Sequence, residues 1–441
     1  MAIPVFEVQF DKSGKVFQPQ QEAAVLRFLT IPPGNQTTDV VALSHGWNND
    51  MDEARTLYRA FLGNLQAWLP ADKAARVIAI GVLWPSKKFA DQDLIPSGAA
   101  AFGPFRALSP LLAAQADQIK HALGSAETDA QMDALAALLP KLENDESAQR
   151  EFVKKLATLL TQATDGTQAS LEEGTPASLQ TRDGAELLRE LSQPLGLEAV
   201  NPKAGGAADF ADSPAAAPGG AAGLEDVFNS ITGGAARLLN YFTYYVMKDR
   251  AGLVGRVGVN PMLSRIQSGI ANDIRLHLAG HSFGGRLVTA TVDGPNRLRV
   301  STLLLLQAAF SHNGFADNYI AGHDGFFVQV AHQRKVNDPI LVTHSDKDEA
   351  VGIAYPLASR ISGDTAAALG DANDIFGGIG RNGAQHMGDQ AQFLTLLGGR
   401  PDYPMATDKV IYNFNGNDVI TSHGDVARPE TAWLLAMRIL A

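Results

Sequence analysis

The amino-acid sequence predicts an α/β fold, in which a mostly parallel central sheet is flanked by helices and carries one large helical insertion. Two observations carry this prediction. Short apolar runs with little polar–apolar alternation recur along the chain, with helical stretches between most of them. That pattern is typical of a parallel sheet covered by helices on both faces. A long Ala-rich segment at residues 87–226 interrupts the alternation.

Six apolar runs are expected to be strands, at residues 40–43, 76–83, 274–279, 301–307, 339–343 and 409–413. Between the first two runs, apolar residues recur with helical spacing from Ala54 to Leu69. They follow Asn49 and Asp50, either of which can cap a helix. A closing helix is expected at residues 431–440.

The predicted domain organisation is one main domain, at residues 1–86 and 227–441, with an insertion at residues 87–226. The insertion has 21 acidic and 11 basic residues, so it carries −10 of the chain's net charge of −11. It has helical stretches and no convincing strand. Its end, residues 204–223, is rich in Gly, Ala and Pro and is expected to be a flexible linker.

Composition excludes several classes of protein. The net charge of −11 argues against binding to a nucleic-acid backbone, and the absence of cysteine excludes disulfides and thiolate metal sites. No apolar stretch is long enough to span a bilayer, and the amino-terminal residues lack the features of a signal peptide. We therefore expect a cytoplasmic protein.

Chemistry is indicated most clearly by the segment Gly280-His-Ser-Phe-Gly284, which lies between an expected strand and an expected helix. A serine on a sharp strand-to-helix turn exposes its hydroxyl above the sheet. Glycine is needed at Gly280 and Gly284 because a Cβ there would clash with the closely packed strand and helix. Ser282 is therefore predicted to be a nucleophile.

A serine hydroxyl needs a base that is held by a carboxylate, and in this type of site the chain order is Ser, acid, His. The strand at residues 339–343 is followed by two candidate acids, of which we prefer Asp348 and keep Asp346 as the alternative. His423 is the histidine that follows the last strand and is the expected base. His386, in a Gly-rich loop, is the second candidate.

Donors for the oxyanion are expected to be backbone N–H groups. One belongs to Phe283, directly after the nucleophile. The other is expected from the loop Ser44-His-Gly-Trp47 after an early strand, with the N–H of Trp47 as the candidate. His45 precedes the nucleophile, and we expect it to support this loop rather than to take part in catalysis.

Four segments, His45-Gly-Trp-Asn, Leu83-Trp-Pro-Ser86, Ala279-Gly-His-Ser-Phe-Gly284 and Ser422-His-Gly-Asp425, together resemble one known family. They resemble the esterase and lipase branch of the α/β-hydrolase superfamily, over residues 38–86 and 230–441. The resemblance implies an α/β-hydrolase fold, the triad Ser282, Asp348 and His423, and oxyanion donors at Trp47 and Phe283. Two features depart from the family pattern: the insertion follows an early strand, and Asp348 and His423 are far apart in the chain.

The function expected from the sequence is hydrolysis of a carboxylic ester, either a small ester or a lipid, through an acyl-enzyme on Ser282. No cofactor or metal is expected. Because the insertion leaves from the strand end that forms the active edge of a parallel sheet, we expect it to cap the site. The alternative is a non-catalytic or acyl-transferring protein of the same fold that binds a partner through its acidic insertion.

Overall fold

The computed structural model describes residues 2–47, 49–86, 116, 119–120, 123, 126–163, 176–193, 230–270, 273–320, 322–348, 375–406 and 408–441. The chain divides into two compact units. The first comprises Met1–Ser86, Arg250–Val351 and Gly377–Ala441, and the second comprises Lys87–Asp249 and Gly352–Phe376. The second unit therefore extends past the expected return at residue 227. The predicted linker at residues 204–223 lies outside the described residues.

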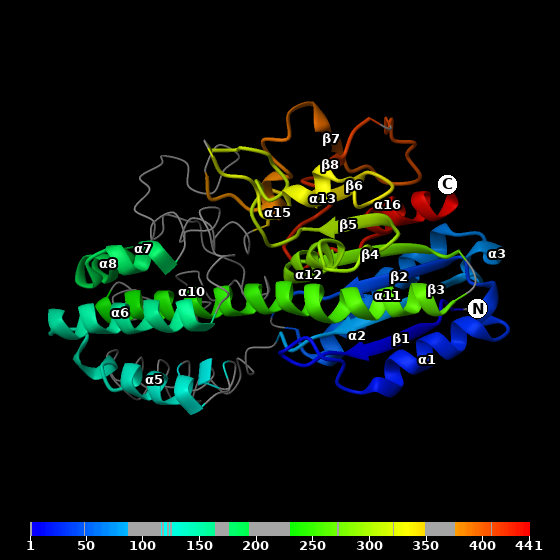
Figure 1. Ribbon diagram of the computed structural model, residues 1–441. Helices are drawn as coiled ribbons and strands as arrows, with labels where there is room; N and C mark the ends of the chain where they lie inside the picture. Colours follow the sequence, from blue (N-terminus) through cyan, green and yellow to red (C-terminus); the bar gives the residue numbers. More distant parts are fainter. Residues whose placement is uncertain are drawn as a thin grey trace, which may run out of the picture. The chain divides into compact units, whose positions relative to one another are not determined.

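The first unit contains an eight-stranded sheet in which every pair of neighbouring strands is parallel, flanked by helices (Figure 1). This architecture confirms the predicted α/β class. The strands are β1 (Val5–Gln9), β2 (Asp39–Ser44), β3 (Val77–Leu83), β4 (Arg275–His281), β5 (Val300–Leu306), β6 (Ile340–His344), β7 (Ala391–Thr395) and β8 (Ile411–Asn415). Their order is β1-β3-β2-β4-β5-β6-β8-β7, so β4 lies in the interior between β2 and β5.

The six predicted strands are present with their ends shifted by at most two residues, whereas β1 and β7 were not predicted. Both missed strands are the edges of the sheet. β1 has a mixed pattern of exposed and buried residues, and no residue of β7 is fully buried. Because an edge strand is covered less completely than an interior one, it lacks the continuous apolar run on which the prediction depended.

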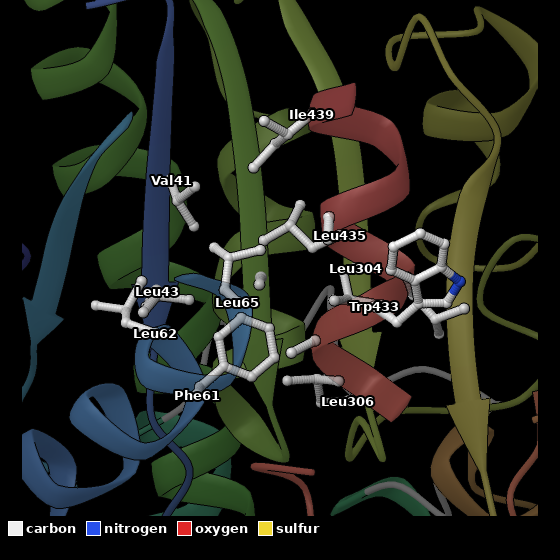
Figure 2. Packing of buried hydrophobic residues seen from close by; sticks show 14 of the residues in the cluster. Val41, Leu43, Phe61, Leu62, Leu65, Leu304, Leu306, Trp433, Leu435 and Ile439 are labelled. Carbon is white, nitrogen blue, oxygen red and sulfur yellow. The ribbon is translucent and has the colours of Figure 1, made fainter. Parts of the chain in front are cut away.

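One face of the sheet is covered by α2 (Met51–Trp68) and α16 (Pro429–Leu440). Figure 2 shows their apolar side chains packed on the interior strands, with Phe61 and Leu65 of α2 lying close to Leu435 of α16. α2 begins at a capping box, in which the Asp50 side chain accepts from the N–H of Glu53 and the Glu53 side chain accepts from the N–H of Asp50. A large cluster of buried apolar side chains therefore lies between these two helices and the strands that they cover.

The other face carries α1 (Pro19–Thr30), a π-helical turn, η7 (Val254–Val259), α11 (Asn260–Gly269) and α12 (Phe283–Val292) (Figure 1). The turn packs closely on α12, since a Cβ at Gly255 would lie 2.1 Å from the carbonyl oxygen of Leu287. Arg265 of α11 and Glu22 of α1 form a two-point ion pair at 2.6 and 2.8 Å. The close approach of Gly255 to Leu287 thus packs the π-helical turn on α12, whose first residue follows Ser282.

The remaining helices of the first unit are short and connect the larger elements: η1 (Gly34–Gln36), α3 (Ala71–Ala74), α13 (Val328–His332), α15 (Ile379–Asn382) and η8 (Gly388–Gln390). At the amino end of the sheet, a buried polar network joins β2, β4 and β5. The ring of His277 bonds Asp39 at 2.9 Å through Nε2 and Thr302 at 3.0 Å through Nδ1. Arg275 adds an ion pair to Asp39 at 2.8 Å. This network holds the strand ends opposite those that carry the candidate site.

The second unit is helical in its described residues, as the predicted insertion requires. Its helices are α5 (Ala126–Ala136), η4 (Leu139–Lys141), α6 (Glu146–Ala163), α7 (Pro176–Thr181), α8 (Gly184–Leu191) and the part of α10 (Ile231–Leu253) that ends at Asp249. Asp183 caps α8 and bonds Arg150 of α6 at 2.7 Å. Gly184 lets the two helices approach, because a Cβ there would lie 2.9 Å from Val153.

None of the helices in the described part of the chain combines the length and the apolar character that crossing a bilayer requires.

Candidate active site

Ser282 occupies the sharp turn between β4 and α12 that the sequence predicts. Its φ of 56° and ψ of −124° are rare for a residue other than glycine, and such strain is retained where the surroundings determine the backbone. Two main-chain bonds hold it to the end of β5: its N–H donates to Leu306 at 3.2 Å, and its carbonyl accepts from Ala309 at 3.0 Å. The neighbouring strand thus fixes the position of Ser282.

Both glycines of the turn are required by sterics. A Cβ at Gly280 would lie 2.2 Å from the carbonyl oxygen of Gly284, and a Cβ at Gly284 would lie 2.3 Å from the carbonyl oxygen of Ser44. Real Cβ atoms do not approach other atoms this closely, so any side chain would force the strand and the helix apart. The two positions allow α12 to begin directly against the ends of β2 and β4.

The loop after β2 lies against Ser282. A Cβ at Gly46 would lie 2.8 Å from Ser282 Cβ and 3.3 Å from Ser282 Oγ, so the main chain of this loop touches the serine. The next residue, Trp47, stacks on Phe283 with ring centroids 5.9 Å apart. The two candidate oxyanion donors, Trp47 and Phe283, therefore flank Ser282 on neighbouring backbone segments.

Hydrogen bonds and ring stacking join the loop after β2 to the turn after β3. The carbonyl of His45 accepts from the indole N–H of Trp84 at 3.0 Å, and the two rings stack with centroids 5.5 Å apart. His45 Nδ1 donates to the carbonyl of Gly46 at 2.9 Å, and its Nε2 accepts from the main-chain N–H of Trp84 at 3.3 Å. The main-chain N–H of His45 also donates a hydrogen bond to the hydroxyl of Tyr58 in α2, at 2.9 Å. His45 therefore supports the loop, in the role that the sequence suggests.

This arrangement predicts how stability depends on pH. Burial lowers the pKa of His45 to about 4, so the unfolded chain binds the proton more readily between pH 4 and pH 6.5. The free energy of unfolding therefore falls as the pH falls through this range, with a contribution from His45 of about 2 kcal/mol between pH 7 and pH 5. Urea unfolding of the wild type and of His45→Gln at pH 7 and pH 5 measures this contribution to the free energy of unfolding. The variant is expected to lose less stability than the wild type, and equal losses would contradict the assignment.

His423 and Asp348 are joined although they lie 75 residues apart in the chain. The ring Nδ1 of His423 bonds both carboxylate oxygens of Asp348, at 2.9 and 3.0 Å. Asp348 is fully buried on a turn after β6, where its N–H bonds the carbonyl of Ser345 at 3.0 Å. Because a carboxylate can only accept, His423 Nδ1 carries the proton and Nε2 is left as the basic atom.

The alternative acid, the second candidate base and Asp425, a further carboxylate near His423 in the chain, have different partners. Asp346 is exposed, and its carboxylate accepts from the side chain of Asn417 at 2.8 Å. Asp425 accepts from the N–H and the hydroxyl of Thr421, at 3.0 and 2.9 Å, within its own turn. His386 bonds Asn313 through Nδ1 at 2.7 Å. Of the candidate acids, Asp348 is thus the one that contacts His423.

Two residues that sequence reasoning did not select hold the main chain of His423. His281 Nε2 bonds the carbonyl oxygen of His423 at 2.9 Å, and the side-chain N–H group of Gln307 reaches the same oxygen at 3.2 Å. Gln307 also bonds the carbonyl of Ser422 at 3.0 Å. The only available signal was their position, since His281 precedes Ser282 and Gln307 follows the end of the adjacent strand, β5.

His423 contacts the residue that precedes Ser282 in the chain. The rings of His281 and His423 lie 4.7 Å apart between centroids, and His281 is adjacent to Ser282 in the chain. Among the described residues, no hydrogen bond joins Ser282 Oγ to the ring of His423. Bonds of this kind are often long before a substrate binds and shorten in the reacting complex.

No group of three or more His, Asp or Glu side chains within the described ranges is arranged to hold a metal ion. Searches of protein-family models, curated proteins and solved structures found no match to this chain. The chemistry of the site therefore has to be inferred from its own residues.

Proposed function

We propose that the chain is a serine hydrolase of the α/β-hydrolase superfamily, which cleaves a carboxylic ester through an acyl-enzyme on Ser282. The observation that carries the proposal is the strained turn of Ser282 beside a buried Asp348–His423 pair. The three residues follow β4, β6 and β8, whose carboxyl ends lie at one edge of the sheet. The chain order Ser, acid, His is that of this superfamily.

In the proposed reaction, His423 Nε2 takes the proton of the Ser282 hydroxyl as Oγ attacks the carbonyl carbon of the ester. Asp348 keeps His423 in the required tautomer and stabilises the imidazolium that forms. The imidazolium then donates its proton to the leaving alkoxide, and the alcohol departs. Water attacks the acyl-enzyme in the second half of the cycle, with His423 again as the base, and releases the carboxylic acid.

The developing negative charge requires donors aimed at the carbonyl oxygen. Phe283 begins α12, so its N–H lies at the positive end of the helix dipole, where negative charge is favoured. The N–H of Trp47 is the proposed second donor, because the preceding residue, Gly46, touches Ser282. The hydrogen bond and the ring stacking between His45 and Trp84 hold this second donor in position before the substrate binds.

Pre-steady-state turnover of a short-chain p-nitrophenyl ester tests this function. We expect a burst of p-nitrophenol that approaches one equivalent of enzyme, with an intact mass increase equal to the acyl group. EDTA is expected to leave both unchanged, because the His–Asp pair supplies the base without a metal. Turnover that EDTA abolishes and added metal restores would contradict this mechanism.

The absence of both turnover and acylation across small and long-chain esters would favour the other class of function. The chain would then be a protein of the same fold that works through its acidic helical insertion, which carries −10 of its net charge. Acylation without release to water would instead point to acyl transfer.

A further inference from the structure

The carbonyl oxygen of His423 accepts two side-chain hydrogen bonds. One comes from His281 Nε2 at 2.9 Å and the other from Gln307 Nε2 at 3.2 Å. His281 is 8% exposed and Gln307 is fully buried, so neither bond competes with bulk water. The two donors come from the ends of β4 and β5, the rigid interior of the sheet.

The acceptor fixes the chemical form of His281. A carbonyl oxygen only accepts, so Nε2 must carry the proton. Burial, and then the proximity of His423, lower the pKa of His281 well below its ordinary value, so the ring is neutral. Its Nδ1 is consequently a buried acceptor, and it has no hydrogen-bond partner among the described residues.

We propose that His281 is a positioning residue for His423. It bonds the main-chain carbonyl of the base and thereby holds the imidazole in reach of both Ser282 and Asp348. This inference rests on the function proposed above. It assigns a role to His281 within the segment Gly280-His-Ser-Phe-Gly284, in which Ser282 and the two glycines already have one.

The geometry shows why a second point of attachment matters. Asp348 fixes one ring nitrogen of His423, but a ring held at one atom can still swing as its loop moves. That loop is a tight turn, in which Asp425 N–H bonds the carbonyl of Ser422 at 3.1 Å. His281 holds the main chain of the turn to the strand that bears the nucleophile. A displacement of about 1 Å at a reacting group can reduce the rate about 10²-fold.

Steady-state kinetics of three matched variants test the role of His281. His281→Leu has a similar volume but lacks the donor, and we expect kcat to fall about 10²-fold with KM unchanged, since His281 is not placed against substrate. In His281→Gln the amide nitrogen lies nearly as far from Cβ as Nε2 does, so we expect kcat within about fivefold of the wild type. His281→Asn is polar but too short to reach, and is expected to resemble the Leu variant.

A second measurement does not depend on turnover. The His423 Nδ1 proton bonded to Asp348 is expected to give a low-field proton resonance in the wild type. We expect it to persist in His281→Gln and to broaden or disappear in His281→Leu and His281→Asn. Thermal unfolding of all four proteins separates a local displacement from a general loss of structure.

The outcomes distinguish this inference from the proposed function. Wild-type kcat and an unchanged resonance in His281→Leu would overturn the positioning role alone. Equal loss of kcat in the Leu and Gln variants, in step with a lower Tm, would make His281 a packing residue and also overturn it. A wild type that neither turns over nor forms an acyl-enzyme would overturn both proposals.

Discussion

Replacing Ser282 with alanine is expected to lower kcat about 10⁶-fold, which is the loss found when the nucleophile of a known serine triad is removed. The turn itself should remain, because it is held by main-chain bonds to Leu306 and Ala309 rather than by the hydroxyl. Alanine and serine are similarly strained at a φ of 56°, so the free energy of unfolding should change by less than about 1 kcal/mol.

Ester turnover and urea unfolding of the purified variant check this expectation together. The matched control is Ser44→Ala, at the end of β2, whose buried hydroxyl makes no hydrogen bond among the described residues. This control should keep wild-type activity. Substantial residual turnover by Ser282→Ala, with the fold intact, would show that the nucleophile is another residue.

Replacing Asp348 with asparagine is expected to lower kcat about 10⁴-fold, the loss measured for the same change in a known triad. The amide that replaces the carboxylate can donate to His423 Nδ1, which favours the tautomer with its proton on Nε2. That tautomer cannot accept the proton of Ser282. Asp346→Asn is expected to stay within about twofold of the wild type, because its exposed carboxylate bonds Asn417 instead.

The two variants make the same chemical change, from a carboxylate to an amide, at positions only two residues apart. Each is therefore the control for the other. Their kcat values should differ by more than about 10³-fold. The reverse ranking would make Asp346 the acid. If neither change mattered, the bond between His423 and Asp348 would have no catalytic role.

The sequence predicted the sheet well because its interior strands are buried on both faces. β2, β3 and β5 read as mainly apolar runs, and β4, which is less apolar, leads directly into the glycine-flanked turn of Ser282. β1 and β7 escaped detection because edge strands carry exposed side chains, such as Phe393, at 50% exposure. The burial that makes a strand recognisable is thus missing at both edges.

The candidate site was predictable to the extent that chain order determines it. Ser282, Asp348 and His423 follow β4, β6 and β8, so their meeting at one edge could be expected from a parallel sheet. The preference for Asp348 over Asp346 depended on which residue lay farther along the loop, and the structure brings Asp348 to His423.

His281 and Gln307 could not be selected from the sequence, because their partner is a main-chain carbonyl. A backbone group leaves no mark on residue identity, so nothing in the sequence around His423 indicates which side chains bond it. The same holds for the oxyanion donors, where Gly46 is informative only once its contact with Ser282 is known.

The most direct test of the central claim is the site at which a fluorophosphonate probe reacts. The probe phosphonylates a serine whose hydroxyl is activated by a neighbouring base, with fluoride as the leaving group, and peptide mass spectrometry locates the adduct. We expect one adduct per chain, on Ser282, formed far more slowly in Asp348→Asn and absent from Ser282→Ala. An adduct on a different serine, or an unlabelled wild type, would contradict the claim that Ser282 is an activated nucleophile.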